Sequence, residues 1–544
     1  MLYNQEYMYS FGYKADGVYK YTEREDNEDF CVSVKNENGI ISAVVTPKRS
    51  IEFEEFEITI PREFADGCRI FTNGYQSWTV SKEYYQGGSM DEFNPKILGI
   101  EKVKFNPLGI WGAGDLKWHK YPELDCTFYG YSYGYERNGN NITLFGSLSE
   151  RVGYTIITFN PLLSTVTISK DLQGKVFDTE LKVLELAVIN DEYDKAFDKY
   201  FEMMNVKPPR VGRKCGYTTW YNYYTGVTED IVNNDLAAIS KLEQKIDIFQ
   251  IDDGFERTVG DWLEVDKKKF PSGMKATADK IHDNNMLAGL WLAPFAATPK
   301  SYIYKNHKDW FVRNDKGKIP YCSHNWGGFF ALDIYNEEVR KHLAHVFDVV
   351  LNHWGYDMVK LDFLYACCQY PIHNKTRGEI MCDAIDLLRE WCGDKIILGC
   401  GCPLAPAFGK VDFMRIGADV SLDWNHKAYS REDVSTQNTL TNTIYRRHLD
   451  GRAWLNDPDV FLLRDNNIKL NTRQKEIIAK VNSLLGNLLF VSDDVSTYNK
   501  EQMKVFTDTI SSEKSKIISA EINDDIATIV TEKGSFSFNI KTGV

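Results

Sequence analysis

The chain has 544 residues, of which 43% are apolar, 26% charged and 13% aromatic. This mix supports large folded cores over several domains and excludes intrinsic disorder as the main state of the chain. The net charge is −13, and because the sequence also has no long basic run, it is a poor candidate for nucleic-acid binding.

Residues 1–206 are predicted to form an antiparallel β-sandwich. The stretch from Phe30 to Ile60 alternates apolar and polar residues, and similar runs follow at NITLFGSL, YTIITF and STVTISKDL. Gly, Asn and Pro separate these runs at short intervals. Period-two alternation with closely spaced turn residues is typical of strands that bury one face.

Residues 207–494 are predicted to form a (β/α)8 barrel. Short apolar runs alternate here with segments of helical length, after a linker at Lys207–Arg210. The eight candidate strands are 215–220, 247–252, 287–292, 356–362, 395–400, 413–419, 453–457 and 487–494. The candidate helices include 230–244, 337–353, 376–392 and about 473–485, the last with Asn471 or Thr472 as its N-cap.

An open doubly wound sheet is the alternative to the barrel. We prefer the barrel because polar residues follow nearly every candidate strand, and because no GxGxxG loop opens the unit. The last segment, residues 495–544, contains KIISAEI, DIATIVT and SFSFNI. It is predicted to form a small C-terminal β domain.

The start of the chain, MLYNQEYMYSFGYK, has no basic segment followed by an apolar run, and no run of about 18 uncharged apolar residues occurs anywhere. We therefore expect neither a secretory signal nor a membrane partner. The 11 cysteines are odd in number and scattered, which favours reduced thiols in a cytoplasmic protein. No zinc-binding spacing is completed, so no metal site is expected.

Chemically active side chains stand at the ends of the predicted strands, where barrel enzymes place their active sites. In strand order they are Asp252 and Asp253, Trp291, Lys360 and Asp362, Cys400, then Arg415 and Asp419. Side chains of a strand alternate, so Lys360 and Asp362 share one face, and the lysine is expected to lower the pKa of this aspartate. Two carboxylates facing one pocket, Asp362 and Asp419, are the minimal machinery of glycoside hydrolysis.

Taken singly, these residues have simpler explanations. An aspartate after a strand is often a helix cap, Asp457-Pro458-Asp459 has the composition of a turn, and Arg464 is expected to pair with one of its acids. Most tryptophans are core residues. The prediction of a site therefore rests on the set of carboxylates rather than on any one member.

Seven motifs occur in order between residues 71 and 464. They are FTNGYQSW (71–78), FQIDDGFE (249–256), a DW to KFPSG stretch (261–273), GLWLAPF (289–295), VKLDFLYA (359–366), GCGCPLAPAFGKVDFMRIGADV (399–420) and WLNDPDVFLLR (454–464). In these motifs the chain resembles glycoside hydrolase family 36, the retaining α-galactosidases, in its shorter bacterial and archaeal form. The resemblance implies the same sandwich, barrel and C-terminal β domain, and no cofactor.

The resemblance also implies a role for each matching residue. Asp362 would be the nucleophile, and Asp419 the general acid and then the general base, protonated at the start through a raised pKa. Their carboxyl groups would lie about 5–5.5 Å apart. The implied sugar-binding residues are Asp252 and Asp253 at the 4-OH and 6-OH of galactose, Lys360 and Arg415 at ring hydroxyls, Trp220, Trp291 and Cys400 on the pocket wall, and Trp78 of the sandwich above the pocket.

The leading hypothesis is a retaining hydrolase of terminal α-galactosyl residues on small galactosides of the melibiose or raffinose type. Cys402 stands where the family usually has Ala or Ser, and Ala418 stands where it usually has Pro. Both positions are close to the proposed site, so α-N-acetylgalactosaminidase activity stays open as an alternative. Transfer of the galactosyl group to a sugar acceptor is a second alternative. A catalytically silent sugar-binding protein is disfavoured because both catalytic positions hold aspartate.

The loop 298–332 is rich in aromatic residues, including Trp310, Trp326 and Phe330. It is the part of the barrel least like the family, and it is expected to shape the leaving-group side of the pocket. The resemblance also implies that the chain forms a homo-oligomer. The composition of the chain carries no information on this point.

Overall fold

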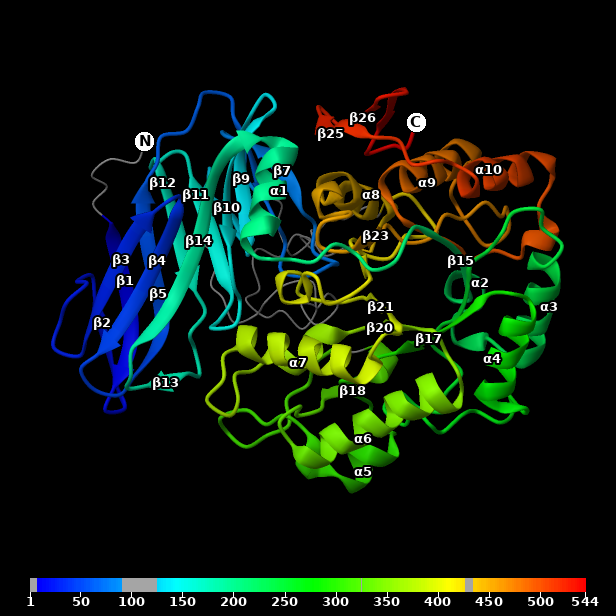
Figure 1. Ribbon diagram of the computed structural model, residues 1–544, viewed down its shortest axis with the longest axis horizontal. Coiled ribbons are helices and arrows are strands. Elements are labelled where there is room, and N and C mark those ends of the chain that lie inside the picture. Colours follow the sequence, from blue (N-terminus) through cyan, green and yellow to red (C-terminus); the bar gives the residue numbers. More distant parts are fainter. Residues whose placement is uncertain (1–6, 91–124, 324, 426–433) are drawn as a thin grey trace, which may run out of the picture.

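The computed structural model describes residues 7–90, 125–323, 325–425 and 434–544. A two-sheet sandwich lies beside a parallel barrel, and a small sheet at the end of the chain lies over both (Figure 1). These parts agree with the fold expected from the sequence. Within the described residues, no helix has the length and apolar character that crossing a membrane requires.

The first sandwich sheet is antiparallel, in the order β2-β1-β5-β12-β11-β8, with β13 also paired to β5. Its strands are β1 (Met8–Ala15), β2 (Val18–Thr22), β5 (Ile51–Pro61), β8 (Phe128–Tyr131), β11 (Thr155–Asn160), β12 (Thr165–Lys170) and β13 (Val176–Phe177). In β5, Phe53 and Phe56 are both buried although they are three positions apart. The register with β1 shifts by one residue between Phe53 and Phe56. This β-bulge lets both side chains point into the core.

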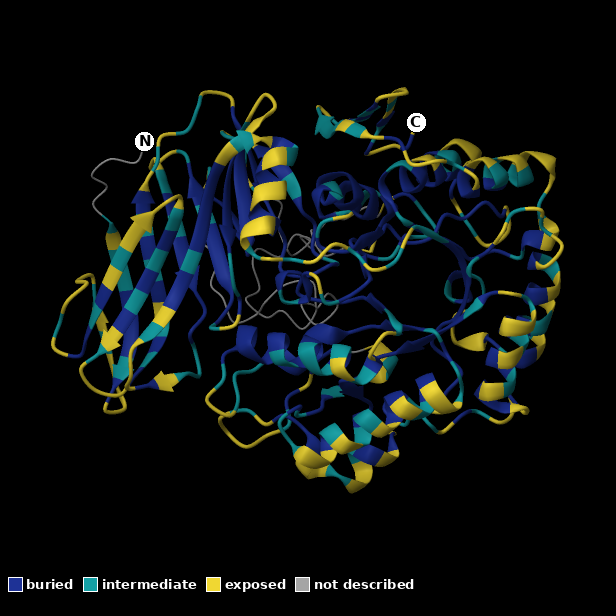
Figure 2. Ribbon diagram, in the orientation of Figure 1, coloured by how far each residue is buried: buried dark blue, intermediate teal, exposed yellow. Residues whose placement is uncertain are grey.

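The second sandwich sheet has the order β3-β4-β14-β10-β9-β6-β7. Its strands are β3 (Phe30–Glu37), β4 (Ile40–Pro47), β6 (Arg69–Thr72), β7 (Lys82–Tyr85), β9 (Tyr133–Asn138), β10 (Asn141–Ser147) and β14 (Leu181–Glu192). Strand β10 is buried at every residue after its first. One of its faces packs in the sandwich core and the other in a core shared with the barrel. Figure 2 shows how far the strands of the sandwich are buried.

The barrel is an eight-stranded parallel sheet in the order β23-β22-β21-β20-β17-β16-β15-β24. Its strands are β15 (Lys214–Thr218), β16 (Ile248–Ile251), β17 (Leu287–Leu292), β20 (Met358–Leu361), β21 (Ile396–Gly399), β22 (Phe413–Arg415), β23 (Leu455–Asp457) and β24 (Leu488–Val491). The Asn487 amide donates to the Asn456 carbonyl at 2.9 Å, and Phe461 bridges to Val491, which closes the ring. Seven of these strands lie within the ranges predicted from the sequence, and β15 begins one residue before its predicted range of 215–220.

The helices comprise one on the sandwich and a ring around the barrel. They are α1 (Tyr193–Met203), α2 (Trp220–Tyr223), α3 (Glu229–Ile239), α4 (Gly273–Asp283), α5 (Tyr302–Asn306), α6 (Glu337–Asp348), α7 (Arg377–Cys392), α8 (Thr436–Tyr445), α9 (Thr472–Leu485) and α10 (Lys500–Ile510). Short strands β18 (Ala296–Ala297) and β19 (Phe330–Ala331) pair within the insertion after β17. The small C-terminal sheet consists of β25 (Ile517–Asn523), β26 (Ile526–Thr531) and β27 (Gly534–Asn539).

One barrel connection departs from the strand–helix repeat. Between β21 and β22 the chain makes only a short 3-10 turn, Ala405–Ala407, because two prolines and two glycines occupy a connection of helical length. The sandwich packs at this place: Phe408 contacts the rings of Tyr133 and Phe201, and Pro403 bridges to Gln76.

Helix α10 lies between the last barrel strand and the C-terminal sheet. The sequence-based boundary at residue 494 assigns this helix to the C-terminal unit. Its Phe506 contacts Phe461 of the barrel, and the helix packs beside α9. We therefore propose that the barrel continues through α10.

Candidate active site

The carboxyl ends of the barrel strands bring most of the predicted site residues to one face. Asp252 and Asp253 follow β16, Trp291 lies in β17, and Lys360 lies in β20 with Asp362 directly after it. Cys400 follows β21 and Arg415 ends β22. Parallel strands present these ends at the same rim of a barrel, which is why residues far apart in the sequence meet here.

Asp362 is almost fully buried, at 7% exposure. The Trp291 indole N–H donates to its Oδ2 at 3.1 Å, and the backbone N–H of Phe363 donates to its Oδ1 at 2.8 Å. Burial raises the pKa of Asp362, Lys360 opposes this, and the charge of Asp419 adds to the rise. Lys360 thus acts on the pKa of Asp362 in the direction expected from the sequence, but the desolvation of the carboxylate, which the sequence reasoning omitted, outweighs it.

Lys360 pairs with Asp252 rather than with Asp362. Its ammonium lies 2.9 Å from Asp252 Oδ2, and both side chains are buried. Burial opposes the charged form of Lys360, but Asp252 outweighs it and raises the pKa of this lysine. The Gln250 amide also donates to Asp252 Oδ2, at 2.7 Å. The pair is thus a fixed cation beside the Asp362 carboxylate.

Asp253 has two partners that the sequence reasoning missed. The Trp326 indole N–H donates to its Oδ2 at 2.7 Å, and the Glu256 carboxyl hydrogen-bonds to it. Burial and the charge of Asp253 raise the pKa of Glu256, so Glu256 is the protonated donor. Trp326 comes from the loop assigned to the leaving-group side, and here it contacts a predicted galactose-binding residue instead.

Arg415 is the centre of a cluster of three carboxylates. Its guanidinium lies 2.8 Å from Asp419, 3.2 Å from Asp457 and 2.7 Å from Asp459. The arginine and the latter two acids are buried, whereas the Asp419 side chain is 40% exposed. Asp419 is thereby held at the open side of the cluster, where a ligand could reach it.

Asp459 supports the segment that carries Asp419. It accepts the Tyr221 hydroxyl proton and the backbone N–H of Val420, the latter at 2.7 Å. Burial raises the pKa of Asp459 to about 7. The DPD sequence is therefore part of the site rather than a simple turn. Arg464, expected to pair with these acids, pairs with Asp493 at 3.0 Å.

The two cysteines of the Cys400-Gly-Cys402 motif lie in different surroundings. The Cys400 thiol is buried among the charges of Asp362, Lys360, Arg415 and Asp419, so it belongs to the pocket wall. The Cys402 thiol faces Cys368 and Cys382, and it donates to the Pro403 carbonyl at 3.1 Å. Cys402 is thus surrounded by other thiols rather than by the charged residues that surround Cys400.

Two tryptophans complete the predicted set. Trp220 begins α2 directly after β15 and packs edge-to-face on Tyr224, whose pKa is raised by burial first and by Asp419 as well. Trp78, between β6 and β7 of the sandwich, packs edge-to-face on Phe363 at 5.1 Å. Its buried indole N–H has no hydrogen-bond partner among the described residues.

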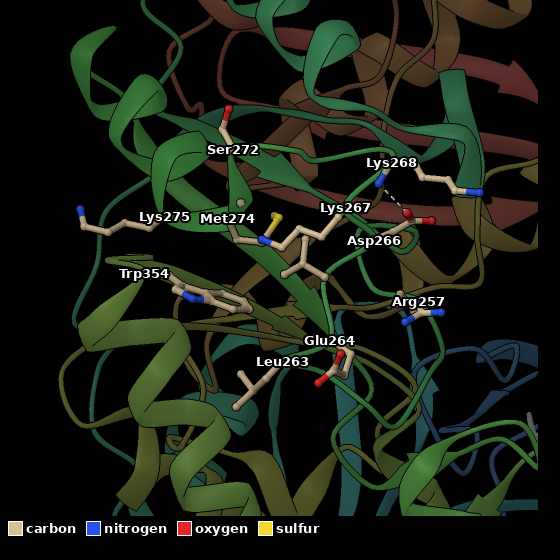
Figure 3. A pocket seen from close by; sticks show the side chains of 12 residues that line it. Arg257, Leu263, Glu264, Asp266, Lys267, Lys268, Ser272, Met274, Lys275 and Trp354 are labelled. Atoms are coloured by element: carbon tan, nitrogen blue, oxygen red, sulfur yellow. Dashed lines mark hydrogen bonds between the residues drawn. The ribbon is translucent and has the colours of Figure 1, made fainter.

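A groove of about 580 Å³ lies away from this rim, behind the loop between β16 and α4 (Figure 3). Lys267, Lys268, Met274 and Trp354 line it with eight other residues. Of the predicted site residues, all within the described ranges, none lines this groove. No group of three or more His, Cys, Asp or Glu in the described part of the chain is arranged to hold a metal ion.

Comparisons with known proteins point to one family. Residues 215–378 match the family model described as Melibiase. Alpha-galactosidase Mel36A of Lactobacillus acidophilus is 29% identical over 150 residues, 26% of this chain and 20% of that protein. The A type blood alpha-D-galactosamine galactosaminidase of Flavonifractor plautii is 28% identical over 139 residues, 24% of this chain and 13% of that protein. The matches thus span a fifth or less of these two relatives.

Among solved structures, the alpha-galactosidase TtGalA from Thermus thermophilus, in complex with p-nitrophenyl α-D-galactopyranoside, has a TM-score of 0.70 to this chain. The likeness covers 93% of this chain and 98% of that one, at 23% identity. At this identity the likeness establishes the shared fold, from the sandwich to the C-terminal sheet.

Proposed function

Since the chain belongs to the Melibiase family, glycoside hydrolase family 36, we propose that it is a retaining α-galactosidase that removes terminal α-D-galactosyl residues from small galactosides. The observation that carries the proposal is the rim of the barrel. There a buried aspartate, Asp362, lies within the electrostatic reach of a more exposed one, Asp419. Lys360 places a positive charge near Asp362, and Arg415 forms an ion pair with Asp419.

The first step is attack by Asp362 on the anomeric carbon of the galactosyl group. As the bond from this carbon to the leaving oxygen breaks, Asp419 donates its proton to that oxygen, and a covalent glycosyl-enzyme ester forms. In the second step Asp419 takes a proton from water, the water oxygen attacks the same carbon, and Asp362 leaves as a carboxylate. Two inversions retain the configuration. The N–H groups of Trp291 and Phe363 stabilise Asp362 whenever it is ionised.

Galactose recognition would fall to the acids after β16. Asp252 and Asp253 are held by Lys360 and by Trp326, with one face left to accept protons from the 4-OH and 6-OH. An axial 4-OH reaches these acceptors, whereas the equatorial hydroxyl of glucose would leave buried acids unpaired. The indole N–H of Trp78, which has no partner within the described part of the chain, supports a further hydrogen bond to the sugar.

Release of nitrophenol from a panel of aryl α-glycosides tests this function. We expect turnover of the α-galactoside, and its loss in Asp362→Gly, which folds but lacks the nucleophile. Added azide should restore release in this variant. Its nitrogen bonds to the anomeric carbon as nitrophenolate departs, which yields the β-galactosyl azide. No turnover of any glycoside by folded wild-type protein would overturn the proposal.

One observation favours a second candidate. The relative from Flavonifractor plautii is a galactosaminidase by name, so the panel should include the α-N-acetylgalactosaminide. If only that substrate were turned over, the proposed mechanism would stand and the proposed sugar would be N-acetylgalactosamine instead of galactose. Product analysis with melibiose or raffinose would separate hydrolysis from galactosyl transfer.

A further inference from the structure

A loop of the sandwich, residues 73–81, docks where the barrel lacks its fifth helix. The backbone N–H of Ser77 donates to the Cys402 carbonyl at 3.0 Å, and Gln76 bridges to Pro403. Gly401 has a φ of 52° and no side chain, and a Cβ there would come within 2.9 Å of the Trp78 ring. The barrel sequence is therefore shaped to receive the loop that carries Trp78.

One buried arginine holds this loop. Arg446, directly after α8, is fully buried, and its guanidinium donates to four neutral acceptors. They are the Ser77 carbonyl at 2.6 Å, the Ile416 carbonyl at 2.8 Å, the Gln76 carbonyl at 2.9 Å and Asn73 Oδ1 at 3.3 Å. Burial lowers the pKa of Arg446 to about 10, so it stays charged at neutral pH. A buried charge needs such a complete set of acceptors.

The four acceptors belong to two segments that must be in register for the site to form. Gln76 and Ser77 directly precede Trp78, whereas Ile416 lies between Arg415 and Asp419. The Trp78 ring in turn rests on Phe363, the residue after Asp362. Arg446 thus links the sandwich wall of the pocket to the barrel segment that carries the proposed acid.

We infer that Arg446 is a positioning residue, which acts through Trp78 to complete the sugar pocket from the sandwich side. The expected effect on KM rests on the proposed function, whereas the expected effect on the position of Trp78 does not. A lysine replaces this arginine only in part. One ammonium can retain the two bonds of Nη1, to the Ser77 and Ile416 carbonyls, but it loses the bonds that Nη2 and Nε make to Gln76 and Asn73 of the loop.

Four proteins test the inference: Arg446→Lys, Trp78→Ala, the double variant, and wild type. We expect Arg446→Lys to raise the KM for p-nitrophenyl α-D-galactopyranoside about tenfold, with kcat changed less than threefold. Trp78→Ala should do the same. The double variant should be no worse than Trp78→Ala alone, because residues that act through one another do not add. If the effect of the double variant on KM equalled the combined effects of the two single variants, the inference would be overturned.

The adjacent Arg447 provides the matched control. It joins the same barrel segment to helix α1, with Asp194 at 3.3 Å and the Tyr193 ring at 4.2 Å. Arg447→Met should lower the melting temperature but leave KM within twofold of wild type. Should Arg446→Lys fail to fold, Asn442→Ala removes the 2.7 Å bond to the Ser81 N–H at the end of the same loop, and it should raise KM about threefold. An unchanged KM there would count against the inference.

A second readout does not depend on activity. Acrylamide quenching of tryptophan fluorescence, compared with and without the Trp78→Phe change, reports the exposure of Trp78. Arg446→Lys should increase the quenching that is due to Trp78, and Arg447→Met should leave it unchanged. If wild type turned over no glycoside, the proposed function would fail while this measurement still decided the inference. Unchanged quenching in Arg446→Lys would overturn it.

Discussion

Asp253 and Glu256 lie together at the barrel rim that carries the proposed site, and their interaction decides which of the two carries the charge. Both are buried, but Asp253 also accepts the indole N–H of Trp326, which favours its ionised form. Glu256 accepts a long bond, 3.3 Å, from the Gly254 N–H on Oε2, and its own backbone N–H also contacts its carboxyl group. Burial raises the pKa of both groups, and that of Glu256 well above its usual value, so we assign the proton of this hydrogen bond to Glu256 and the acceptor role to Asp253.

This assignment predicts different results for two substitutions of Glu256. Gln keeps a donor toward Asp253, so Glu256→Gln should retain kcat/KM within about threefold. Glu256→Leu removes the donor from a charged acceptor, a loss of ~1.5–3 kcal/mol that lowers kcat/KM by about tenfold or more. Steady-state kinetics with the aryl galactoside measures both. Equal activity of the two variants would mean that this hydrogen bond does not position Asp253.

The same residue gives a pH dependence of stability. The pKa of Glu256 is higher in the folded than in the unfolded chain. Its contribution to stability is therefore complete at acid pH, below about 4.3, and is lost as the pH rises through the folded pKa. Gln cannot ionise, so Glu256→Gln should gain stability relative to wild type between pH 4 and pH 8. Urea unfolding at both ends of this range measures the difference, and a constant difference would contradict it.

At the scale of single elements, the start of α9 resolves an alternative that the sequence left open. Asn471, not Thr472, is the N-cap: its side chain accepts the Gln474 N–H at 2.9 Å, and Gln474 Oε1 accepts the Asn471 N–H at 3.0 Å. These reciprocal bonds satisfy two backbone donors that a helix end otherwise leaves free.

The cap predicts a contrast between neighbouring positions. Asn471→Ala should lower the free energy of unfolding by ~1 kcal/mol, because the cap acceptor is lost. Asn471→Asp should be close to neutral, since aspartate caps as well and its charge suits a helix start. Thr472→Ala should also be nearly neutral. Urea unfolding of the three variants provides the measurement, and a larger effect at Thr472 than at Asn471 would reverse the assignment.

The elements show what the sequence could and could not predict. Apolar runs and turn residues were enough to locate all eight barrel strands, because burial and period are local properties of the chain. Side-chain partners were not predictable. Lys360 is two residues from Asp362, yet it pairs with Asp252, which lies 108 residues away in the sequence. Trp326 likewise contacts Asp253 across 73 residues. Only the closed barrel sets such distances.

At the scale of the whole molecule, ion pairs join the sandwich to the barrel in two different environments. Arg377, the first residue of α7, pairs with Asp171 of the sandwich at 3.1 Å, and both are buried. Its guanidinium also donates to Gln173 at 2.8 Å. Arg151 and Asp386 form a second pair across the same interface, in which the Arg151 side chain is 51% exposed and that of Asp386 36% exposed. Each pair joins an arginine to an aspartate, and the two differ in the solvent exposure of their charged groups.

These environments predict unequal effects on stability. Arg377→Met leaves the Asp171 carboxylate buried without its cation, and burial already raises the pKa of this group, so the loss should be ~3–5 kcal/mol. Adding Asp171→Leu removes the stranded charge and should restore most of that loss. Arg151→Met, the exposed control, should change stability by no more than ~1 kcal/mol. Denaturant unfolding followed by circular dichroism measures all three, with kcat/KM as a check that the barrel rim is intact. If Arg377→Met were as mild as Arg151→Met, burial would not be what makes this interface stable.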